Sequence, residues 1–362
     1  MNQNIVQGPW TQNQNMQDIS YQWVQKIPDI QYIEKGIPIM CFAQDSATRN
    51  LAMEFRLIRK ITETQYHNEK LKQFDSNLSK MNRYNTILPY THTEVILKQD
   101  HDDNEECYIN ASYINSIFEN EGEKRFIATQ GPLPNTIANF WKMIYIFNTE
   151  TIVMLCNLKE NHKVQCEQYW PNQVGQTCQY QKFQITLNSE DIIYEKLHKR
   201  QLLISNNQLG EQKAVTQYQF IDWKDHGIPS ETDFNIINFI VQFMIEEYEK
   251  NKISVIHCSA GVGRTGTIIS LVNLMLNIKC YLPQIQETIK NKYNLNHCTI
   301  SVFGIVRRLR EQRWGMVNQP EQYEYIYKFI KIQIDKILKD YKFDIVFGLQ
   351  MNQSLDIIKQ DL

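Results

Sequence analysis

The stretch SVIHCSAGVGRTGTIISL, residues 254–271, runs from a short apolar segment through a glycine-rich turn into a second apolar segment. Five residues separate Cys258 from Arg264 within the turn. The pattern predicts a buried strand, a tight loop and the start of a helix. Two interpretations follow, a dinucleotide-binding turn and an anion-binding loop around a reactive cysteine.

The dinucleotide interpretation rests on Gly261, Gly263 and Gly266, which match G-x-G-x-x-G between a strand and a helix. The strand, however, lies far from the start of any strand–helix–strand series. Glu287, about 20 residues further on, does not end a second apolar strand. That motif also requires neither the cysteine nor the arginine. The glycine pattern leaves this interpretation open, but the neighbouring residues weaken it.

The anion-binding interpretation uses every residue of the turn. A loop of this length, rich in glycine and alanine, lets successive backbone N–H groups point inward, and the helix beginning near Arg264 adds its positive dipole end. The Arg264 guanidinium suits two oxygens of a phosphate. The same field stabilises the Cys258 thiolate, the nucleophilic form of the side chain. We therefore predict attack on phosphorus and a phosphocysteine intermediate; a buried cysteine beside a structural arginine leaves the clustering unexplained.

An alkoxide or phenolate leaves poorly unless a general acid protonates it. The best candidate is Asp225 in WKDHGIP, residues 223–229, between a strand predicted to end at Trp223 and a helix predicted after Asp233. Loops carry such residues because they close over substrate and exclude water. Most loop aspartates are solvated or cap helices, so this segment alone leaves the role open.

Composition narrows the class of protein. A formal charge of -2 over 362 residues gives no electrostatic case for nucleic acid or an acidic membrane surface. The eight cysteines are scattered and predict reduced thiols, and the histidines lack metal-ligand spacing, so we expect no metal site. No cofactor is predicted. The N-terminus does not resemble a signal peptide, and we find no run of about 18 apolar residues. We expect a cytoplasmic protein without a membrane span; oligomeric state is not predicted.

The pattern of apolar residues predicts one α/β domain over residues 47–338, with a Gln/Asn-rich N-terminal extension over 1–46 and a C-terminal extension over 339–362. Helices are predicted within 47–63, 136–147, 233–250, 265–277, 300–313 and 321–338. Strand-rich runs are predicted within 107–114, 125–131, 150–158, 165–171, 183–187, 200–205, 215–223 and 252–257.

These residues resemble a known family, the tyrosine-specific protein tyrosine phosphatases of the non-receptor type. IHCSAGVGRTGT is similar to the family's signature loop, and WKDHGIP to its mobile acid loop. Further motifs match in order, namely KMNRYNTILPY (80–90), CYINASYI (107–114), FIATQGPL (126–133) and VRRLREQRWGMVNQPEQY (306–323). The resemblance covers about residues 47–338. It implies a single domain with a highly twisted mixed sheet flanked by helices, and phosphotyrosine proteins as partners in signal transduction.

By position, the resemblance makes Cys258 the nucleophile, Arg264 the phosphate clamp and Asp225 the general acid and then base. Thr265 would hydrogen-bond the departing thiolate, and Tyr84 would line a deep site that excludes the shorter phosphoserine. The remaining residues implied to bind substrate are Ser259, Ala260, Gly261, Val262, Gly263, Trp223 and His226. Those implied to support the site are His257, Glu160, Asn318 and Gln322.

Three departures from the family pattern carry consequences. Lys224 replaces a proline in the acid loop, and we expect altered loop closure because proline restricts φ. Asn318 replaces the glutamine that aligns the hydrolytic water, so hydrolysis of the intermediate is the step at risk, unless Gln319 or Gln322 compensates. Thr86 replaces an acidic or amide residue that holds the substrate backbone.

Two alternatives to an active phosphotyrosine phosphatase remain. The first is a binding module that keeps phosphotyrosine affinity but turns over too slowly to act as an enzyme, which the three departures leave open. The second, a phosphatase for lipids or phosphoserine, is disfavoured by Tyr84 and by the neutral SAGVG loop.

Overall fold

An eight-stranded mixed sheet lies at the centre of the molecule, in the order β2-β3-β11-β4-β10-β9-β8-β7. The computed structural model describes residues 34–63, 76–97, 107–116, 125–291 and 297–340. The strands of this sheet are β2 (Ala111–Ile114), β3 (Phe126–Thr129), β4 (Thr151–Met154), β7 (Thr177–Tyr180), β8 (Phe183–Ile193), β9 (Leu197–Asn206), β10 (Glu211–Phe220) and β11 (Ser254–His257). Two small pairs accompany it, β1 (Ile37–Pro38) with β12 (Thr299–Ile300) and β5 (Lys159–Glu160) with β6 (Lys163–Val164).

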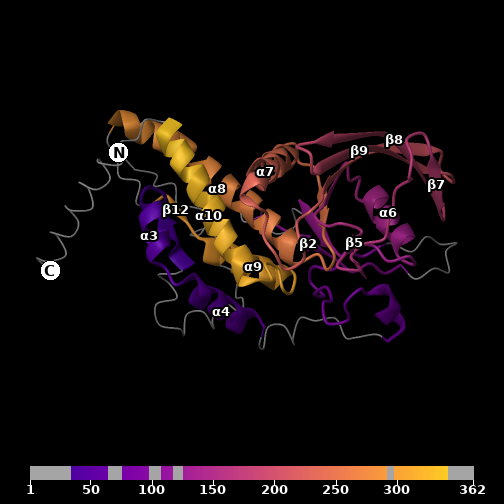
Figure 1. Cartoon of the computed structure of the whole chain (residues 1–362), viewed down its shortest axis with the longest axis horizontal. Helices are drawn as coiled ribbons and strands as arrows, with labels where there is room; N and C mark the ends of the chain where they lie inside the picture. The colour runs from indigo at the N-terminus through magenta and orange to yellow at the C-terminus, as the bar shows by residue number, and fades with distance from the viewer. Residues whose placement is uncertain (1–33, 64–75, 98–106, 117–124, 292–296, 341–362) are drawn as a thin grey trace, which may run out of the picture.

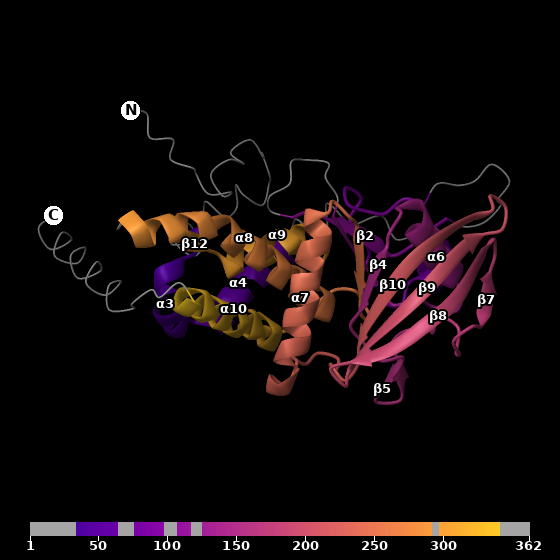
Figure 2. The same ribbon diagram turned by 90° about the horizontal axis from the view of Figure 1, so that it is seen from above.

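The helices lie on both sides of this sheet (Figures 1 and 2). They are α3 (Phe42–Thr48), α4 (Leu51–Thr62), α6 (Ile137–Ile146), α7 (Phe234–Glu249), α8 (Gly263–Asn291), α9 (Val302–Gln312) and α10 (Pro320–Asp340), with the short 3-10 helices η1 (Ile39–Cys41), η2 (Ser76–Met81) and η3 (Glu231–Asp233). Figure 2 shows α7 against one face of the sheet and α6 on the other, with α8, α9 and α10 gathered beyond α7.

The parallel centre of the sheet explains where the site lies. Strands β3, β11, β4 and β10 run parallel, and every residue of the first three is buried. Strands buried on both faces read as short apolar runs, as FIAT, TIVM and SVIH do. Ligands bind outside the carboxyl ends of such strands. The loop after β11, which holds Cys258, begins at that edge.

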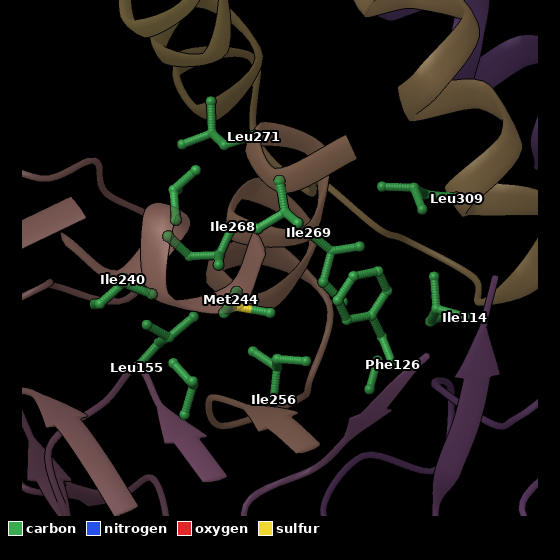
Figure 3. Close-up of a cluster of buried hydrophobic side chains, with 14 of the residues drawn as sticks. Ile114, Phe126, Leu155, Ile240, Met244, Ile256, Ile268, Ile269, Leu271 and Leu309 are labelled. Atoms are coloured by element: carbon green, nitrogen blue, oxygen red, sulfur yellow. The ribbon is translucent and has the colours of Figure 1, made fainter. Parts of the chain in front are cut away.

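Helix α8 packs its apolar side chains directly over β11. In Figure 3, Ile268 and Ile269 lie above Ile256, with Met244 of α7 between them and Phe126 of β3 to one side. All five side chains are buried. This packing fixes the strand-to-helix turn between β11 and α8 from both ends.

The first part of α8, Gly263–Ile285, is long and apolar enough to cross a membrane by length and composition alone. In the fold, 72% of its most apolar window is buried, as in the core helix of a globular domain.

Most predicted elements are present, with two corrections. Residues 165–171 were predicted to be strand-rich but form no strand, because their large side chains pack inward: Trp170 stacks beneath the Arg200 guanidinium at 4.4 Å. The strand predicted to end at Trp223 ends at Phe220, since Asp222 takes a left-handed φ of 72° that breaks the extended backbone.

The domain limits stay a prediction. Residues 1–33 and 341–362, most of the two predicted extensions, lie outside the described residues. Within the predicted N-terminal extension, Ile37, Ile39 and Phe42 are buried in the common core, and β1 pairs with β12.

Candidate active site

The loop between β11 and α8 turns its carbonyl groups outward. The Ser259 carbonyl accepts the Gly131 N–H at 2.8 Å, and the Val262 carbonyl accepts the N–H groups of Gly266 and Val317 at 2.8 and 3.1 Å. A peptide plane carries its C=O and N–H on opposite sides. The backbone N–H groups of the loop therefore face inward, toward a common centre, and form an anion-binding nest.

These inward N–H groups have no acceptor within the described part of the chain. For the N–H groups of residues 259–264, no hydrogen bond to backbone or side chain is found there. Gly261 makes the turn possible: its φ is 70°, and a Cβ there would lie 2.1 Å from the Thr129 carbonyl oxygen. This loop (residues 258–264), from here on called the phosphate loop, has the backbone geometry that can hold an anion.

Arg313 supports the phosphate loop from outside, and the sequence analysis did not identify it. Its guanidinium donates to the carbonyls of Gly261 and Ala260 at 2.9 and 3.0 Å, and to Ser112 Oγ and Asn110 Oδ1 at 3.1 and 2.8 Å. Burial lowers the pKa of Arg313 to about 10, so the guanidinium is still cationic at neutral pH. The charge strengthens the bonds that aim the loop inward.

Cys258 is buried, with 3% of its surface exposed, and the residue before it is held firmly. His257 Nδ1 lies 3.2 Å from the Cys258 carbonyl oxygen and its Nε2 lies 2.8 Å from the Tyr169 hydroxyl. Since a carbonyl only accepts, the imidazole proton sits on Nδ1. Gln217 donates to the Tyr169 oxygen at 2.6 Å and completes the chain.

Arg264 is buried at the start of α8 and has three partners. Its Nη1 donates to Glu160 Oε1 and to the Trp223 carbonyl, both at 2.7 Å, and its Nη2 lies 3.2 Å from Asp225 Oδ1. Burial by itself lowers the pKa of Arg264, but the surrounding thiols and carboxylates, Cys258 first among them, raise it above its ordinary value. The Arg264 guanidinium therefore stays protonated, and its bonds to Glu160 and to the Trp223 carbonyl fix its position.

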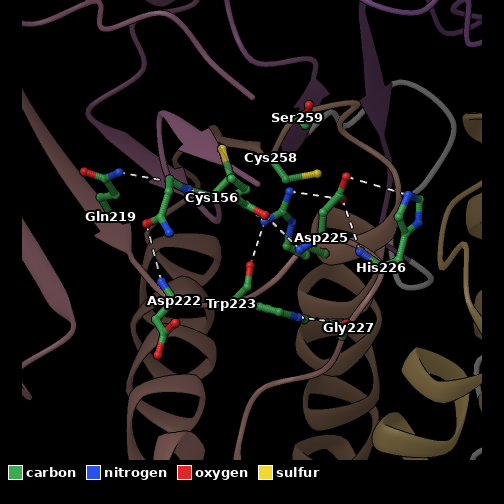
Figure 4. Close-up of polar contacts among 12 residues, drawn as sticks. Cys156, Gln219, Asp222, Trp223, Asp225, His226, Gly227, Cys258 and Ser259 are labelled. Atoms are coloured by element: carbon green, nitrogen blue, oxygen red, sulfur yellow. Dashed lines mark hydrogen bonds and ion pairs between the residues drawn. The ribbon is translucent and has the colours of Figure 1, made fainter. Parts of the chain in front are cut away.

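The loop around Asp225, residues 223–229, lies over the phosphate loop and is called the acid loop below. Figure 4 shows the Cys258 thiol pointing toward the Asp225 carboxylate. Glu160 Oε2 accepts the Asp225 N–H at 2.8 Å, so one carboxylate orients both the arginine and the acid loop. Trp223 is fully buried and its Nε1 donates to the Gly227 carbonyl at 3.0 Å, closing the loop on itself.

The segment before α10 contacts both the phosphate loop and the acid loop. Gln322, which is buried, accepts the N–H groups of Asn318 and Gln319 at 3.1 and 3.3 Å and donates to the Gly227 carbonyl at 3.2 Å. The Asn318 Cβ lies 3.6 Å from the position of a Cβ on Gly263. The Asn318 side chain makes no hydrogen bond to another described residue.

The remaining predicted residues surround the same centre. The Tyr84 hydroxyl lies 3.2 Å from Ser259 Oγ, and Lys163 Nζ lies 4.8 Å above the Tyr84 ring. Thr265 is fully buried at the second residue after the loop's last glycine, and its hydroxyl has no partner among the described residues. Thr86 and Lys224 are exposed.

The geometry brings together almost every residue that the sequence singled out. Asp225, Glu160, Arg264 and the phosphate loop form one connected network, with Tyr84 at one side and Gln322 at the other. The arrangement combines a buried thiol, an anion nest, a clamped guanidinium and a carboxyl group. Within the described ranges, no group of three His, Cys, Asp or Glu side chains is placed to hold a metal ion.

The chain is similar to known families and proteins. A family model described as protein-tyrosine phosphatase matches residues 78–331. Human tyrosine-protein phosphatase non-receptor type 4 is 32% identical over 327 residues, which are 85% of this chain and 32% of that protein. Tyrosine-protein phosphatase 1 of Dictyostelium discoideum is 38% identical over 253 residues, which are 65% of this chain and 46% of that protein.

Solved structures give the same result for the fold. The catalytic domain of human protein tyrosine phosphatase non-receptor type 18 matches with a TM-score of 0.66 and 29% identity, covering 82% of this chain and 99% of that one. The chain thus spans a whole solved catalytic domain but only about a third of the first curated relative and less than half of the second.

Proposed function

Because the chain belongs to the protein-tyrosine phosphatase family, we propose that it hydrolyses phosphotyrosine in proteins through a phosphocysteine formed on Cys258. The observation that carries the proposal is the phosphate loop. Its inward N–H groups surround a buried thiol, with the Arg264 guanidinium fixed beside it. Such a site binds a phosphate dianion and stabilises the charge that develops on its oxygens during transfer.

In the first step, the Cys258 thiolate attacks phosphorus and forms an S–P bond. The bond between phosphorus and the tyrosine oxygen breaks, and its electron pair goes to that oxygen. Asp225 supplies the proton, so tyrosine leaves as a neutral phenol. Substrate phosphate takes the Arg264 Nη2 that Asp225 holds at 3.2 Å, which frees the carboxyl group to carry this proton.

In the second step, water attacks the phosphocysteine and Asp225 removes its proton. The S–P bond breaks, inorganic phosphate leaves, and the thiolate returns. We assign the Thr265 hydroxyl, which is buried and without a partner among the described residues, as the donor to the departing sulfur. Asn318 lies beside Gly263, and we assign its side chain to align the attacking water.

Tyr84 is the residue that sets the substrate class we propose. The Tyr84 hydroxyl is tied to Ser259, so its ring forms a fixed wall beside the phosphate loop. A tyrosine ring beside the loop favours phosphotyrosine, because a shorter phosphoserine cannot reach the buried Cys258. Phosphotyrosine-containing proteins are the partners we propose, and the likeness to non-receptor phosphatases supports the cytoplasm as the place of action.

Replacing Asp225 by alanine tests the proposal. We expect kcat/KM for a phosphotyrosyl peptide to fall about 10² to 10⁴-fold, the usual contribution of a general acid. Hydrolysis of the matched phosphoseryl peptide should be far slower than that of the phosphotyrosyl peptide by the unaltered protein. Phosphate release from both peptides measures these rates.

The control is Asp335→Ala, an exposed carboxylate on α10 away from the site. Tight phosphotyrosyl-peptide binding without measurable turnover by the unaltered protein would instead support the binding module. Equal rates on both peptides would contradict the proposed substrate class.

Replacing Asn318 by glutamine tests the second step. The asparagine side chain is shorter than glutamine by one methylene, about 1.5 Å, and misplacement by about 1 Å costs on the order of a hundredfold. Gln319 and Gln322 do not take its place, since both amides bond to the acid loop. We expect a pre-steady-state burst of phenol with slow turnover, and a kcat increase approaching a hundredfold in Asn318→Gln. Absence of a burst together with an unchanged kcat would contradict this assignment.

A further inference from the structure

We propose that Gln319 is a positioning residue that holds the acid loop over the phosphate loop through His226. The proposal rests on the proposed function, because it concerns the placement of Asp225 as the general acid. Its evidence is separate and lies in the contact between the start of α10 and the acid loop.

The contact joins two side chains that are far apart in sequence. Gln319 Nε2 lies 2.9 Å from His226 Nδ1. An amide nitrogen only donates, so Nδ1 accepts, and the proton of the neutral imidazole lies on Nε2. The Nε2 atom is 3.6 Å from Asp225 Oδ2. Gln319 thus selects the tautomer whose N–H faces the carboxylate of the proposed acid.

Because of its backbone conformation, His226 needs a partner outside the acid loop to hold its imidazole in this position. Its φ is 60°, in the left-handed region that non-glycine residues rarely adopt, and 65% of its side chain is exposed. This turn brings the His226 N–H to 3.2 Å from Asp225 Oδ1 and the imidazole back over the same carboxylate, as Figure 4 shows. A strained, exposed residue keeps one conformation only when its neighbours hold it.

Gln319 is well placed to hold it, because its own backbone is fixed. Gln322 accepts the Gln319 N–H at 3.3 Å, and Pro320 begins α10 directly afterwards. Two residues earlier, Val317 donates its N–H to the Val262 carbonyl of the phosphate loop at 3.1 Å. The start of α10 therefore connects the phosphate loop to the acid loop, with the Gln319 side chain as the outermost connection.

The expected consequence is a defect confined to the acid step. Loss of one hydrogen bond of this kind changes an equilibrium by about three- to tenfold. Without it the acid loop spends less time closed, and Asp225 is less often in place. The loss matters most when the leaving group needs a proton and least when it leaves readily as an anion.

The test compares Gln319→Leu with the unaltered protein on two aryl phosphates. We expect kcat/KM to fall about three- to tenfold for phenyl phosphate, whose phenolate leaves poorly, and less than about twofold for 4-nitrophenyl phosphate, whose phenolate leaves readily. The exposed neighbour Glu321, changed to Gln, is the matched control. Equal losses on both substrates, or no loss on either, would overturn the proposal.

A double-mutant cycle separates the contact from general damage. In a His226→Ala background, Gln319→Leu should have no further effect, because the two residues act as one unit. His226→Asn keeps an acceptor near the position of Nδ1 and tolerates positive φ, so it should retain the dependence on Gln319. Additive effects of Gln319→Leu and His226→Ala would contradict the proposal. If Asp225→Ala leaves phenyl phosphate hydrolysis unchanged, the proposed function fails; if only Gln319→Leu is without effect, this proposal fails alone.

Discussion

Replacing Cys258 by serine is expected to abolish turnover of phosphotyrosyl peptides, lowering kcat on the order of 10⁶-fold, while phosphotyrosine binding persists. A serine hydroxyl does not ionise near neutral pH, so the phosphate loop would hold its anion without a nucleophile beside it. Loss of a nucleophile that works as a unit with its base and anion site costs this much in other hydrolases. Phosphate release in the presence of excess peptide measures kcat.

Binding by the same variant separates chemistry from folding. The inward N–H groups of the phosphate loop and Arg264 stay in place, and the substrate dianion no longer faces a thiolate. We therefore expect the affinity for a fluorescent phosphotyrosyl peptide, measured by anisotropy, to be unchanged or higher. Cys280→Ser makes the same chemical change at an exposed position on α8 and should leave kcat unaltered. Retained turnover in Cys258→Ser would contradict the proposed nucleophile, and lost binding would show that the loop had collapsed.

The features that can be predicted from the sequence are those formed by residues close together in the chain. A strand, the phosphate loop and a helix follow one another within 254–271, as residue spacing and glycine content predict, and the anion site at that loop stays a prediction. Asp225 was a candidate for a similar reason, because Gly227 and Pro229 mark its loop. The structure brings that aspartate to Arg264, 39 residues further on, which no local pattern shows.

The part that sequence could not predict depends on contacts between distant segments. Arg313 follows α9 and is one arginine among several in RRLREQR, but the other ends of its hydrogen bonds are phosphate-loop carbonyls 52 and 53 residues away. Arginine side chains are mostly exposed in proteins, so the sequence predicts a solvated side chain at such a position. A buried cation with four acceptors becomes evident only when the sheet has assembled.

The strand-rich prediction for 165–171 fails for a related physical reason. Tyr, Trp and apolar residues favour strands because they fit a half-buried pleated surface. Here Tyr169 and Trp170 are buried for other purposes: one holds His257 and the other stacks on Arg200. The same side chains that indicate a strand in the sequence pack around His257 and Arg200 in the fold.

Replacing Arg264 by lysine is the second change with a large expected effect. Lysine keeps the positive charge but not the planar fork, so one ammonium cannot contact two phosphate oxygens while it also bonds to Glu160 and the Trp223 carbonyl. Arginine groups that stabilise a transferring phosphoryl contribute about 10³ to 10⁵ in kcat, and loss of one donor to developing charge costs about 10² to 10³. We expect kcat to fall about 10³-fold and KM for a phosphotyrosyl peptide to rise.

The change also tests whether Arg264 connects the acid loop to the phosphate loop. Arg264 Nη1 holds the Trp223 carbonyl, so Arg264→Lys should weaken closure of the acid loop as well as phosphate binding. Glu160→Gln keeps the guanidinium but removes the charge that orients it, and we expect a smaller loss in kcat, about tenfold to a hundredfold. Arg59→Lys, whose exposed side chain pairs with Glu63, is the matched control and should leave kcat and the melting temperature unchanged. If Arg264→Lys raises KM alone and leaves kcat intact, the guanidinium binds substrate without stabilising the transition state, and the proposed clamp is wrong.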